Sequence, residues 1–224
     1  MPEGLLQYDL GAGVEAFTAG RDSVLPYPVV QGHQVHDTRV AVVERWMTRE
    51  ELEGYDAFVT RVPGLAVGVR TADCVPVLLY DPVHRAVAAV HAGWKGTVKH
   101  ISQLAIEVLT GRYGCEPSGM RAVIGPAIGP DSFQVGEEVV ARFREAGFPL
   151  AEVWSFRGQG DGSPMSGGHH IDLFRANKWL LEQAGIPTAN ISVLDVDTYT
   201  ETSLFSARRE GTACGRNINS IRLI

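Results

Sequence analysis

A cysteine and a histidine stand at the two ends of a predicted β-hairpin. Two short apolar runs flank the turn Asp81–His84, and strand-like runs with a four-residue connection are typical of a hairpin. If Tyr80 pairs with Arg85, Cys74 lies directly opposite His91. Residues opposed in this way hold their Cβ atoms roughly 4.5–5.5 Å apart on one face of the sheet. At that separation a thiolate and an imidazole can share one metal ion, or act as a nucleophile and its base.

This pairing depends on the register, because a slip of one residue would move the two side chains to opposite faces. Pro76 cannot donate to a sheet ladder, which indicates that its strand lies at an edge or begins beside a bulge. A cysteine at a strand start is usually a small buried hydrophobe, and a lone histidine is usually structural. Asp73 before the thiol and the run Gly93–Thr97 after the imidazole favour a site over a core.

Two further histidines, His33 and His36, lie in a β-rich segment. Side chains three residues apart share a face in a helix but not in a strand. In an extended segment one of them therefore points to the site and the other away. We favour His36 as the residue that joins Cys74, with Gln34 nearby as a polar contact.

The residues after the hairpin predict an anion-binding feature. The loop Gly93–Gly96 precedes apolar residues that recur at helical spacing from Val98 to Leu109. The loop is therefore expected at a helix N-terminus, where free N–H groups and the helix dipole favour an anion. Lys95 would add a point charge. The alternative is a tight entry turn with a solvated lysine.

The C-terminal half carries two other candidate features. Arg208 and Arg209, on a segment expected to be extended, face opposite ways, so one can reach an anion and the other a surface carboxylate. The glycine-rich stretch 155–169 is predicted to be one long loop, either a mobile lid or disordered. His169 and His170 end it, and exposed loop histidines are more often unliganded than metal ligands.

The composition narrows the class of protein. A chain of 224 residues with 45% hydrophobic and 21% charged residues fits one globular domain. A net charge of −6 argues against broad binding to nucleic acid or anionic membranes. No apolar run approaches the roughly 20 residues that span a bilayer, and the N-terminus lacks signal-peptide features. Three widely spaced cysteines, Cys74, Cys115 and Cys214, form no disulfide framework, so a cytoplasmic location is expected.

Strands and helices alternate along the chain, with hairpins as well as helices joining the strands. Strands are expected at 56–60, 65–70, 122–124 and 191–196, and helices near 139–146 and 173–184, the latter capped by Asp172. This pattern predicts an α+β fold with mixed sheets, not a doubly wound parallel sheet.

Five stretches carry a family resemblance. They are Gln34–His36, Thr71–Cys74, His91–Gly96, Gly125–Pro130 and Phe205–Arg216. Together they resemble the laccase-domain family, whose members are called polyphenol oxidases, peptidoglycan editing factor and purine nucleoside phosphorylases. The resemblance implies one domain over residues 1–224, with a shortened N-terminal part at 1–26. It also implies a four-layer α/β/β/α arrangement with two packed mixed sheets. Asp197 and Ala207 depart from the family's usual Cys and Tyr near the expected pocket.

The resemblance further implies that His36, Cys74 and His91 bind zinc, or copper in its place. Two histidines and one cysteine with a fourth position open match a catalytic zinc site. A zinc-bound water could attack C6 of a purine and release ammonia. Asp73 is the nearest candidate proton shuttle for such a deamination.

The implied substrates are small molecules: adenosine, inosine and methylthioadenosine, cleaved by phosphorolysis. That reaction needs a phosphate aimed at the sugar C1′ and a proton for the leaving purine. Lys95 and Arg208 are predicted to hold the phosphate. Gln34 and Trp94 are predicted as further substrate contacts.

Three alternatives remain open at this point. A mononuclear copper oxidase is compatible with two His and one Cys, although the chain has no His-x-His pair for a multicopper cluster. A metal-free hydrolase or amidase acting on peptidoglycan precursors would use Cys74 as nucleophile and His91 as base. A zinc-stabilised interaction module would close the metal with a fourth ligand such as His33.

Overall fold

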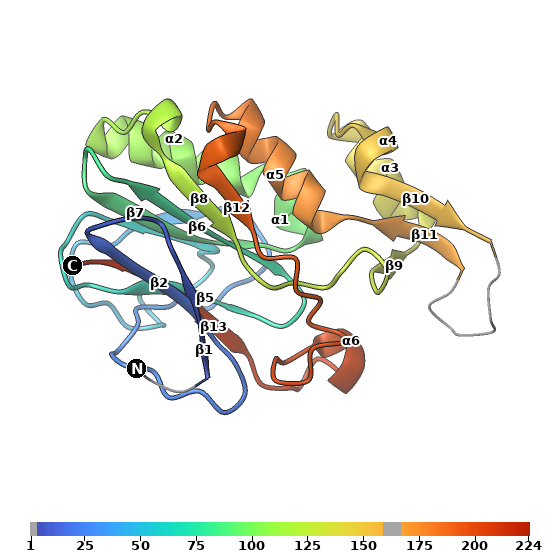
Figure 1. Ribbon diagram of the computed structural model, residues 1–224, viewed down its shortest axis with the longest axis horizontal. Helices are drawn as coiled ribbons and strands as arrows, with labels where there is room; N and C mark the ends of the chain where they lie inside the picture. The colour runs from blue at the N-terminus through green and yellow to red at the C-terminus, as the bar shows by residue number, and fades with distance from the viewer. Residues whose placement is uncertain (1–3, 159–166) are drawn as a thin grey trace.

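Two stacked sheets form the body of the protein (Figure 1). The computed structural model describes residues 4–158 and 167–224. The six-stranded sheet has the order β12-β8-β6-β7-β4-β3, with β12 (Ile191–Val193), β8 (Arg121–Ile124), β6 (Val75–Asp81), β7 (Ala86–Ala92), β4 (Ala57–Thr60) and β3 (Val40–Val42). The four-stranded sheet has the order β1-β2-β13-β5, with β1 (Leu5–Tyr8), β2 (Val14–Ala19), β13 (Asn217–Leu223) and β5 (Val67–Thr71).

The predicted α+β class with two packed sheets is confirmed. In the six-stranded sheet β12 pairs with β8 and β3 with β4 in parallel, and the other pairs are antiparallel. The pairs of the four-stranded sheet are all antiparallel. The predicted strands are present, with ends that differ by up to three residues.

The β6–β7 hairpin lies at the centre of the six-stranded sheet and is buried at every residue. Leu78 and Val87 belong to the apolar core between the two sheets. Leu79 and Val90 belong to the core on the opposite face, under the helices. Burial on both faces explains why these strands are continuous apolar runs in the sequence.

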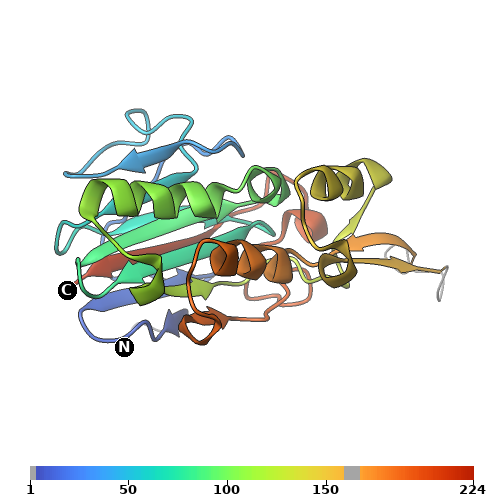
Figure 2. The ribbon, with the colours of Figure 1, turned by 90° about the horizontal axis from the view of Figure 1, so that it is seen from above.

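Helices cover the outer face of the six-stranded sheet. Seen from above, α2 (Ile101–Tyr113) and α5 (Leu173–Gln183) run side by side over its strands (Figure 2). The Asp172 carboxylate caps α5 by accepting the N–H of Arg175 at 2.9 Å, as predicted. The short helix α6 (Ala207–Glu210) lies at the end of the four-stranded sheet (Figure 1). None of the helices in the described ranges is long and apolar enough to cross a membrane.

The helix expected after Gly96 starts earlier and is broken. Gly93 is the N-cap of α1 (Trp94–Val98), so Trp94 and Lys95 belong to the first helical turn and not to a loop before it. His100, in the left-handed conformation with φ of 61°, separates α1 from α2. The single helix of the prediction is therefore two helices.

The register of the β6–β7 hairpin differs by two residues from the predicted one. Tyr80 pairs with Val87 and not with Arg85. Cys74 and His91 are therefore not directly opposed. A shift of two residues keeps every side chain on its original face, so both residues still serve the same side of the sheet.

The chemistry of the turn explains this shift. Asp81 stays in β6 and pairs with Ala86. Its carboxylate accepts the main-chain N–H groups of Val83 at 2.8 Å and His84 at 3.0 Å, which sets the start of the turn. Arg85, with a left-handed φ of 49°, closes it. The loop is thus 82–85, one residue later than predicted.

Pro76 does not mark an edge strand, because β6 lies between β7 and β8. The proline is the second residue of β6, and the ladder with β8 begins only at Val77. The Pro76 carbonyl accepts the N–H of Gly125 at 2.9 Å on this side. The missing N–H therefore falls where pairing ends, a position that tolerates proline.

A smaller unit projects from the body beside α5 (Figure 1). It contains a three-stranded sheet of order β10-β11-β9 with two helices. Its elements are β9 (Gln134–Val135), α3 (Glu137–Glu145), α4 (Leu150–Val153), β10 (Trp154–Arg157) and β11 (Gly168–Ile171). Outside this unit the chain forms two 3-10 helices, Pro117–Gly119 and Thr188–Asn190.

The long loop predicted over 155–169 is a pair of strands at its two ends, and its middle lies outside the described residues. His169 and His170 are thus in a strand and not in a loop. Both form cross-strand pairs, His170 with Ser155 and His169 with Phe156.

Candidate functional site

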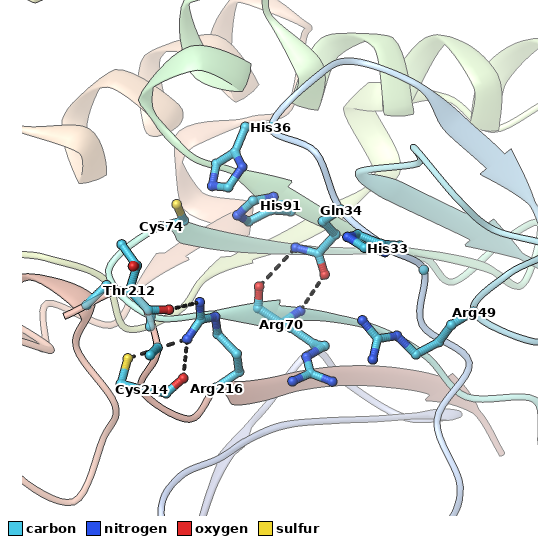
Figure 3. A pocket seen from close by; sticks show the side chains of 14 residues that line it. His33, Gln34, His36, Arg49, Arg70, Cys74, His91, Thr212, Cys214 and Arg216 are labelled. Atoms are coloured by element: carbon cyan, nitrogen blue, oxygen red, sulfur yellow. Dashed lines mark hydrogen bonds between the residues drawn. The ribbon is translucent and has the colours of Figure 1, made fainter. Parts of the chain in front are cut away.

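Three side chains from separate parts of the chain converge at one end of the β6–β7 hairpin (Figure 3). His36 comes from the loop before β3, Cys74 directly precedes β6, and His91 lies near the end of β7. One donor atom of each lies within 4.8 Å of the others. His91 is buried, Cys74 half-buried and His36 exposed. The three predicted ligand residues thus form one group that opens outward at His36.

Asp56 positions both histidines. Its buried carboxylate accepts the Nδ1 hydrogen of His91, with Oδ1 and Nδ1 2.7 Å apart. It also accepts the main-chain N–H groups of Val35 at 3.1 Å, His36 at 2.9 Å and Asp37 at 3.0 Å. These bonds hold His36 at a left-handed φ of 62° and turn Nε2 of His91 toward the other two side chains. A carboxylate behind a ligating histidine is a common support of metal sites.

The electrostatics of the group favour a thiolate. Burial by itself would raise the pKa of Cys74, but the charge of His91 and hydrogen bonds with His36 and His91 outweigh it and lower the pKa to about 6. Burial would likewise lower the pKa of His91, whereas the Cys74 thiolate and Asp56 raise it to about 9. Without a metal the pair is therefore a thiolate and an imidazolium near neutral pH. The thiolate is the form that binds metals and attacks electrophiles.

Gly93 leaves the space that the group occupies. A Cβ atom at this position would lie 2.8 Å from Sγ of Cys74 and 3.3 Å from Cδ2 of His36. The backbone there has φ of −64°, which any residue adopts. The glycine is thus required by close approach and not by backbone geometry.

A cavity of about 520 Å³ opens beside the group. Arg49, Arg70 and Arg216 line it, and in Figure 3 their guanidinium groups lie below the histidines and the cysteine. Among the described lining residues there is no Asp or Glu. Burial lowers the pKa of Arg70, and the like charges of Arg49 and Arg216 lower it further. Three cations in a lining whose described residues include no carboxylate favour an anionic ligand.

Strand pairing brings two of these arginines together. Arg70 in β5 pairs with Ile218 in β13, and Arg216 lies two residues before Ile218, which is the same face of a strand. The Arg216 guanidinium is tied down by the carbonyls of Thr212 at 2.8 Å and Gly215 at 2.9 Å. The arginines therefore sit on a fixed frame.

Gln34 lines the cavity but uses its amide on the protein itself. Its Nε2 donates to the Arg70 carbonyl at 2.9 Å, and its Oε1 accepts the Arg70 N–H at 2.8 Å (Figure 3). The side chain thus joins the His36 loop to β5. Gln34 therefore has a positioning role. Its contact with substrate remains a prediction.

The other predicted residues lie outside the set that lines the cavity. Trp94 and Lys95 are in α1, and Lys95 is exposed with Nζ 5.8 Å from the Trp94 ring centroid. Arg208 is in helix α6 and not in an extended segment, and its guanidinium donates to the carbonyls of Ser132 at 3.3 Å and Gln134 at 3.1 Å. Their predicted roles toward substrate remain predictions.

Asp73 links two distant segments. It has a left-handed φ of 85°, and its carboxylate accepts the Thr198 hydroxyl at 2.7 Å and the Arg208 N–H at 2.6 Å. Arg209 donates to the carbonyls of Thr198 and Tyr199, both at 2.7 Å. It also pairs with the carboxylate of Glu210, so the predicted ion pair is one of several contacts. These contacts fix α6 beside the site. Both carboxylate oxygens of Asp73 are thus engaged by the C-terminal segment.

Known proteins are similar to this chain in sequence and in fold. The family model described as "Multi-copper polyphenol oxidoreductase laccase" matches residues 17–224. The chain belongs to this family. The protein "Adenosine deaminase RL5" from an unknown prokaryotic organism is 41% identical over 201 residues, which are 86% of this chain and 74% of that protein. "Purine nucleoside phosphorylase" of Bacteroides thetaiotaomicron is 36% identical over 209 residues, 90% of this chain and 75% of that protein.

Two solved structures have a similar fold. The crystal structure of Bacillus licheniformis hypothetical protein YfiH matches with a TM-score of 0.81 and 28% identity, over 94% of this chain and 93% of that one. YlmD from Geobacillus stearothermophilus matches with a TM-score of 0.80 and 26% identity, over 99% and 96%. The predicted family is confirmed.

The donor set of this laccase-like chain fits a single metal ion. Two imidazoles and a thiolate are ligands that zinc and copper both accept. The carboxylate of Asp56 leaves Nε2 of His91 as the donor. At this cavity the described residues offer one such group, which fits a mononuclear site.

The two departures from the family pattern fall in different places. Ala207 lines the cavity, so the smaller side chain adds room there. Asp197 instead accepts the N–H of Gly129 at 2.9 Å and the Ser132 hydroxyl at 2.5 Å, and so organises the loop of the Gly125–Pro130 stretch. Only the alanine is placed to affect substrate directly.

Proposed function

We propose that this protein is a metal-dependent purine nucleoside enzyme that cleaves adenosine, inosine and methylthioadenosine by phosphorolysis and also deaminates adenosine. The observation that carries the proposal is the joining of two unlike subsites in one cavity. The His36, Cys74 and His91 group forms one end, and three arginines form the other, in a lining whose described residues include no Asp or Glu. The relatives named adenosine deaminase and purine nucleoside phosphorylase support the same substrate class.

The arginine end is the proposed phosphate subsite. A phosphate dianion would offset the mutual repulsion of Arg49, Arg70 and Arg216, and guanidinium groups bind phosphate oxygens in bidentate fashion. Lys95 and Arg208, predicted for this role from the sequence, lie outside the lining of the cavity. The proposal therefore assigns the phosphate to the three arginines.

The metal end is held by the chain's own residues in defined roles. His36, Cys74 and His91 would hold zinc, or copper, which supplies Lewis-acid polarisation when bound. Asp56 keeps the Nδ1 hydrogen of His91 engaged and fixes its ring. His33 lines the cavity outside this group and is the proposed proton donor to the leaving purine. Asp73, predicted as the proton shuttle of the deamination, is less suited to proton transfer, because both its carboxylate oxygens are engaged.

The test is a product analysis with zinc-loaded protein and a panel of purine nucleosides, with and without phosphate. We expect free base from adenosine, inosine and methylthioadenosine only when phosphate is present, and inosine from adenosine in either condition. Arg70→Ala should raise the KM for phosphate roughly 10- to 100-fold, the effect of losing a charged hydrogen bond of about 1.5–3 kcal/mol. Release of base without phosphate, or equal loss in the control Lys95→Ala, would contradict the proposal.

A second candidate is a metal-free hydrolase or amidase that acts on peptidoglycan precursors. The thiolate and imidazolium pair of Cys74 and His91, with a Cys74 pKa of about 6, favours nucleophilic catalysis by sulfur. Chelator treatment separates the two candidates. A thiol hydrolase keeps its full activity after metal removal and loses it on alkylation of Cys74, whereas the nucleoside enzyme loses activity with its metal.

A further inference from the structure

The turn end of the β6–β7 hairpin carries a second group of mixed ligand residues. Asp81, His84 and Cys115 each offer one donor atom, and these atoms lie within 4.8 Å of one another. Nδ1 of His84 is 3.0 Å from Oδ2 of Asp81. Asp81 and Cys115 are each only 1% exposed, while the His84 side chain is 35% exposed. The group is therefore buried on two sides and open at its histidine.

Two rigid elements hold the group together. Asp81 ends strand β6, and its Oδ1 is occupied by the N–H groups of Val83 and His84, which leaves Oδ2 to face the histidine ring. Cys115 follows α2, where Gly114 ends the helix in the left-handed conformation with φ of 73°. The hairpin turn and the helix end thus meet at these donors.

A neighbouring polar group without a partner points to a ligand at this place. Tyr113 is 9% exposed, and its hydroxyl is buried with no hydrogen-bond partner among the described residues. Tyr113 and His84 line the same surface cavity. A buried hydroxyl that lacks a partner calls for a water or an ion nearby. Arg61 and Arg85 also line this cavity, so the hydroxyl marks a place for a polar ligand such as water beside His84.

We propose that Asp81, His84 and Cys115 form a second metal site, for zinc or a divalent ion of similar preference. A carboxylate, a neutral imidazole and a thiolate balance the charge of a divalent ion. Zinc accepts all three kinds of ligand, and three protein ligands leave its fourth position open. Binding displaces the Cys115 thiol proton to solvent as the sulfur–metal bond forms. The fourth position is left for water.

This site is separate from the first one. Strand β6 has seven residues, so its two ends lie roughly 20 Å apart at about 3.3 Å per residue. The His36, Cys74 and His91 group is at one end, and Asp81 is at the other. A metal here would cross-link the hairpin turn to the end of α2 and stabilise the core without contacting substrate. The inference does not rest on the proposed function.

The experiment uses the full chain with the first site removed. The Cys74→Ser protein, stripped with a chelator and dialysed against zinc, is expected to retain one equivalent of zinc by elemental analysis. Adding His84→Ala should abolish that equivalent, while adding His100→Ala, a half-exposed histidine outside both groups, should leave it. Retention of zinc after His84→Ala, or no bound zinc in Cys74→Ser, would overturn the proposal.

Cobalt spectroscopy supplies a second test, which does not rely on the His84→Ala variant being folded. Cobalt bound to Cys74→Ser protein should show a thiolate-to-cobalt charge-transfer band in the near ultraviolet. The band should disappear with Cys115→Ser and persist with Cys214→Ser, the matched control thiol. A band that survives Cys115→Ser, in protein whose circular dichroism is unchanged, would equally overturn the proposal.

Discussion

Asp56 and His91 are joined by a buried contact of 2.7 Å between Oδ1 and Nδ1. The same carboxylate accepts the main-chain N–H of His36 at 2.9 Å. One acidic side chain thus orients one histidine through its ring and places another through its backbone. We expect the geometry of the whole group to depend on this residue more than on any single donor.

Replacing Asp56 by asparagine should therefore weaken metal binding. The amide has one acceptor oxygen in place of two, so the His91 ring and the 35–37 loop cannot both be held. Loss of such a supporting carboxylate typically costs 10- to 100-fold in metal affinity. Zinc affinity by chelator competition measures it. Asp37→Asn, an exposed carboxylate paired with Lys99, is the control and should bind zinc normally. Equal affinities in both variants would refute this role of Asp56.

The pH at which the Cys74 thiol reacts at half its maximal rate should be below neutral. Because the pKa of this thiol is lowered to about 6, loss of its proton occurs near that pH in the chelator-treated protein. The rate of alkylation by iodoacetamide should rise with pH, reach half its maximum near pH 6 and level off above it. An ordinary thiol would do so near 8.5. The Cys74→Ser protein supplies the background, and a midpoint above 8 would show that the two histidines do not stabilise the thiolate.

Alanine at Gly93 should remove the metal site with little effect on the fold. The added Cβ would lie 2.8 Å from Sγ of Cys74 and 3.3 Å from Cδ2 of His36, so the donor group must shift from its present geometry. The backbone conformation itself tolerates alanine. Gly111→Ala, inside α2 with nothing within 4 Å of the new Cβ, is the matched control and should raise stability by about 0.5–1 kcal/mol. Zinc content and thermal unfolding, measured on both variants, separate the effects. Normal zinc content in Gly93→Ala would contradict the expectation.

Removing one cavity arginine should cost phosphate binding and not stability. Arg49 and Arg216 oppose the charge of Arg70, so Arg49→Ala relieves repulsion. We expect its melting temperature in phosphate-free, low-salt buffer to equal or exceed that of the natural protein. The rise in melting temperature on adding phosphate should shrink at the same time. Arg45→Ala, which removes an exposed partner of Glu51, should keep that rise. A phosphate effect that persists in Arg49→Ala would place the anion elsewhere.

The sequence could predict which residues of the hairpin belong to the site, but not which residues from other segments join them. Cys74 and His91 share a side because strand alternation depends only on the parity of the register, and the error of two residues preserved it. The error arose because the Asp81 carboxylate, which sets the turn, acts through hydrogen bonds that hydrophobic patterning does not report. The central strands could be predicted because burial on both faces makes them continuous apolar runs. The helices could be predicted because their apolar residues recur at helical spacing.

Residues that act across long separations could not be found in this way. The sequence pattern predicts Asp56 only as the start of a strand, and the lone acid before a fully apolar run is the one signal of its role. Arg70 and Arg216 meet because β5 and β13 are neighbours, which depends on the sheet order. No spacing between positions so far apart indicates that pairing. Local motifs surround Lys95 and Arg208, so sequence patterns favour these two residues instead.

Phosphorus NMR of adenosine and phosphate with zinc-loaded protein tests the central claim most directly, since it follows transfer of the sugar to phosphate. We predict that ribose 1-phosphate forms with the natural chain and with Lys95→Ala, and that it is absent with Cys74→Ala and strongly reduced with Arg70→Ala. Undiminished ribose 1-phosphate with Cys74→Ala and Arg70→Ala, or none with the natural chain, would contradict the assignment of both ends of this cavity to one reaction.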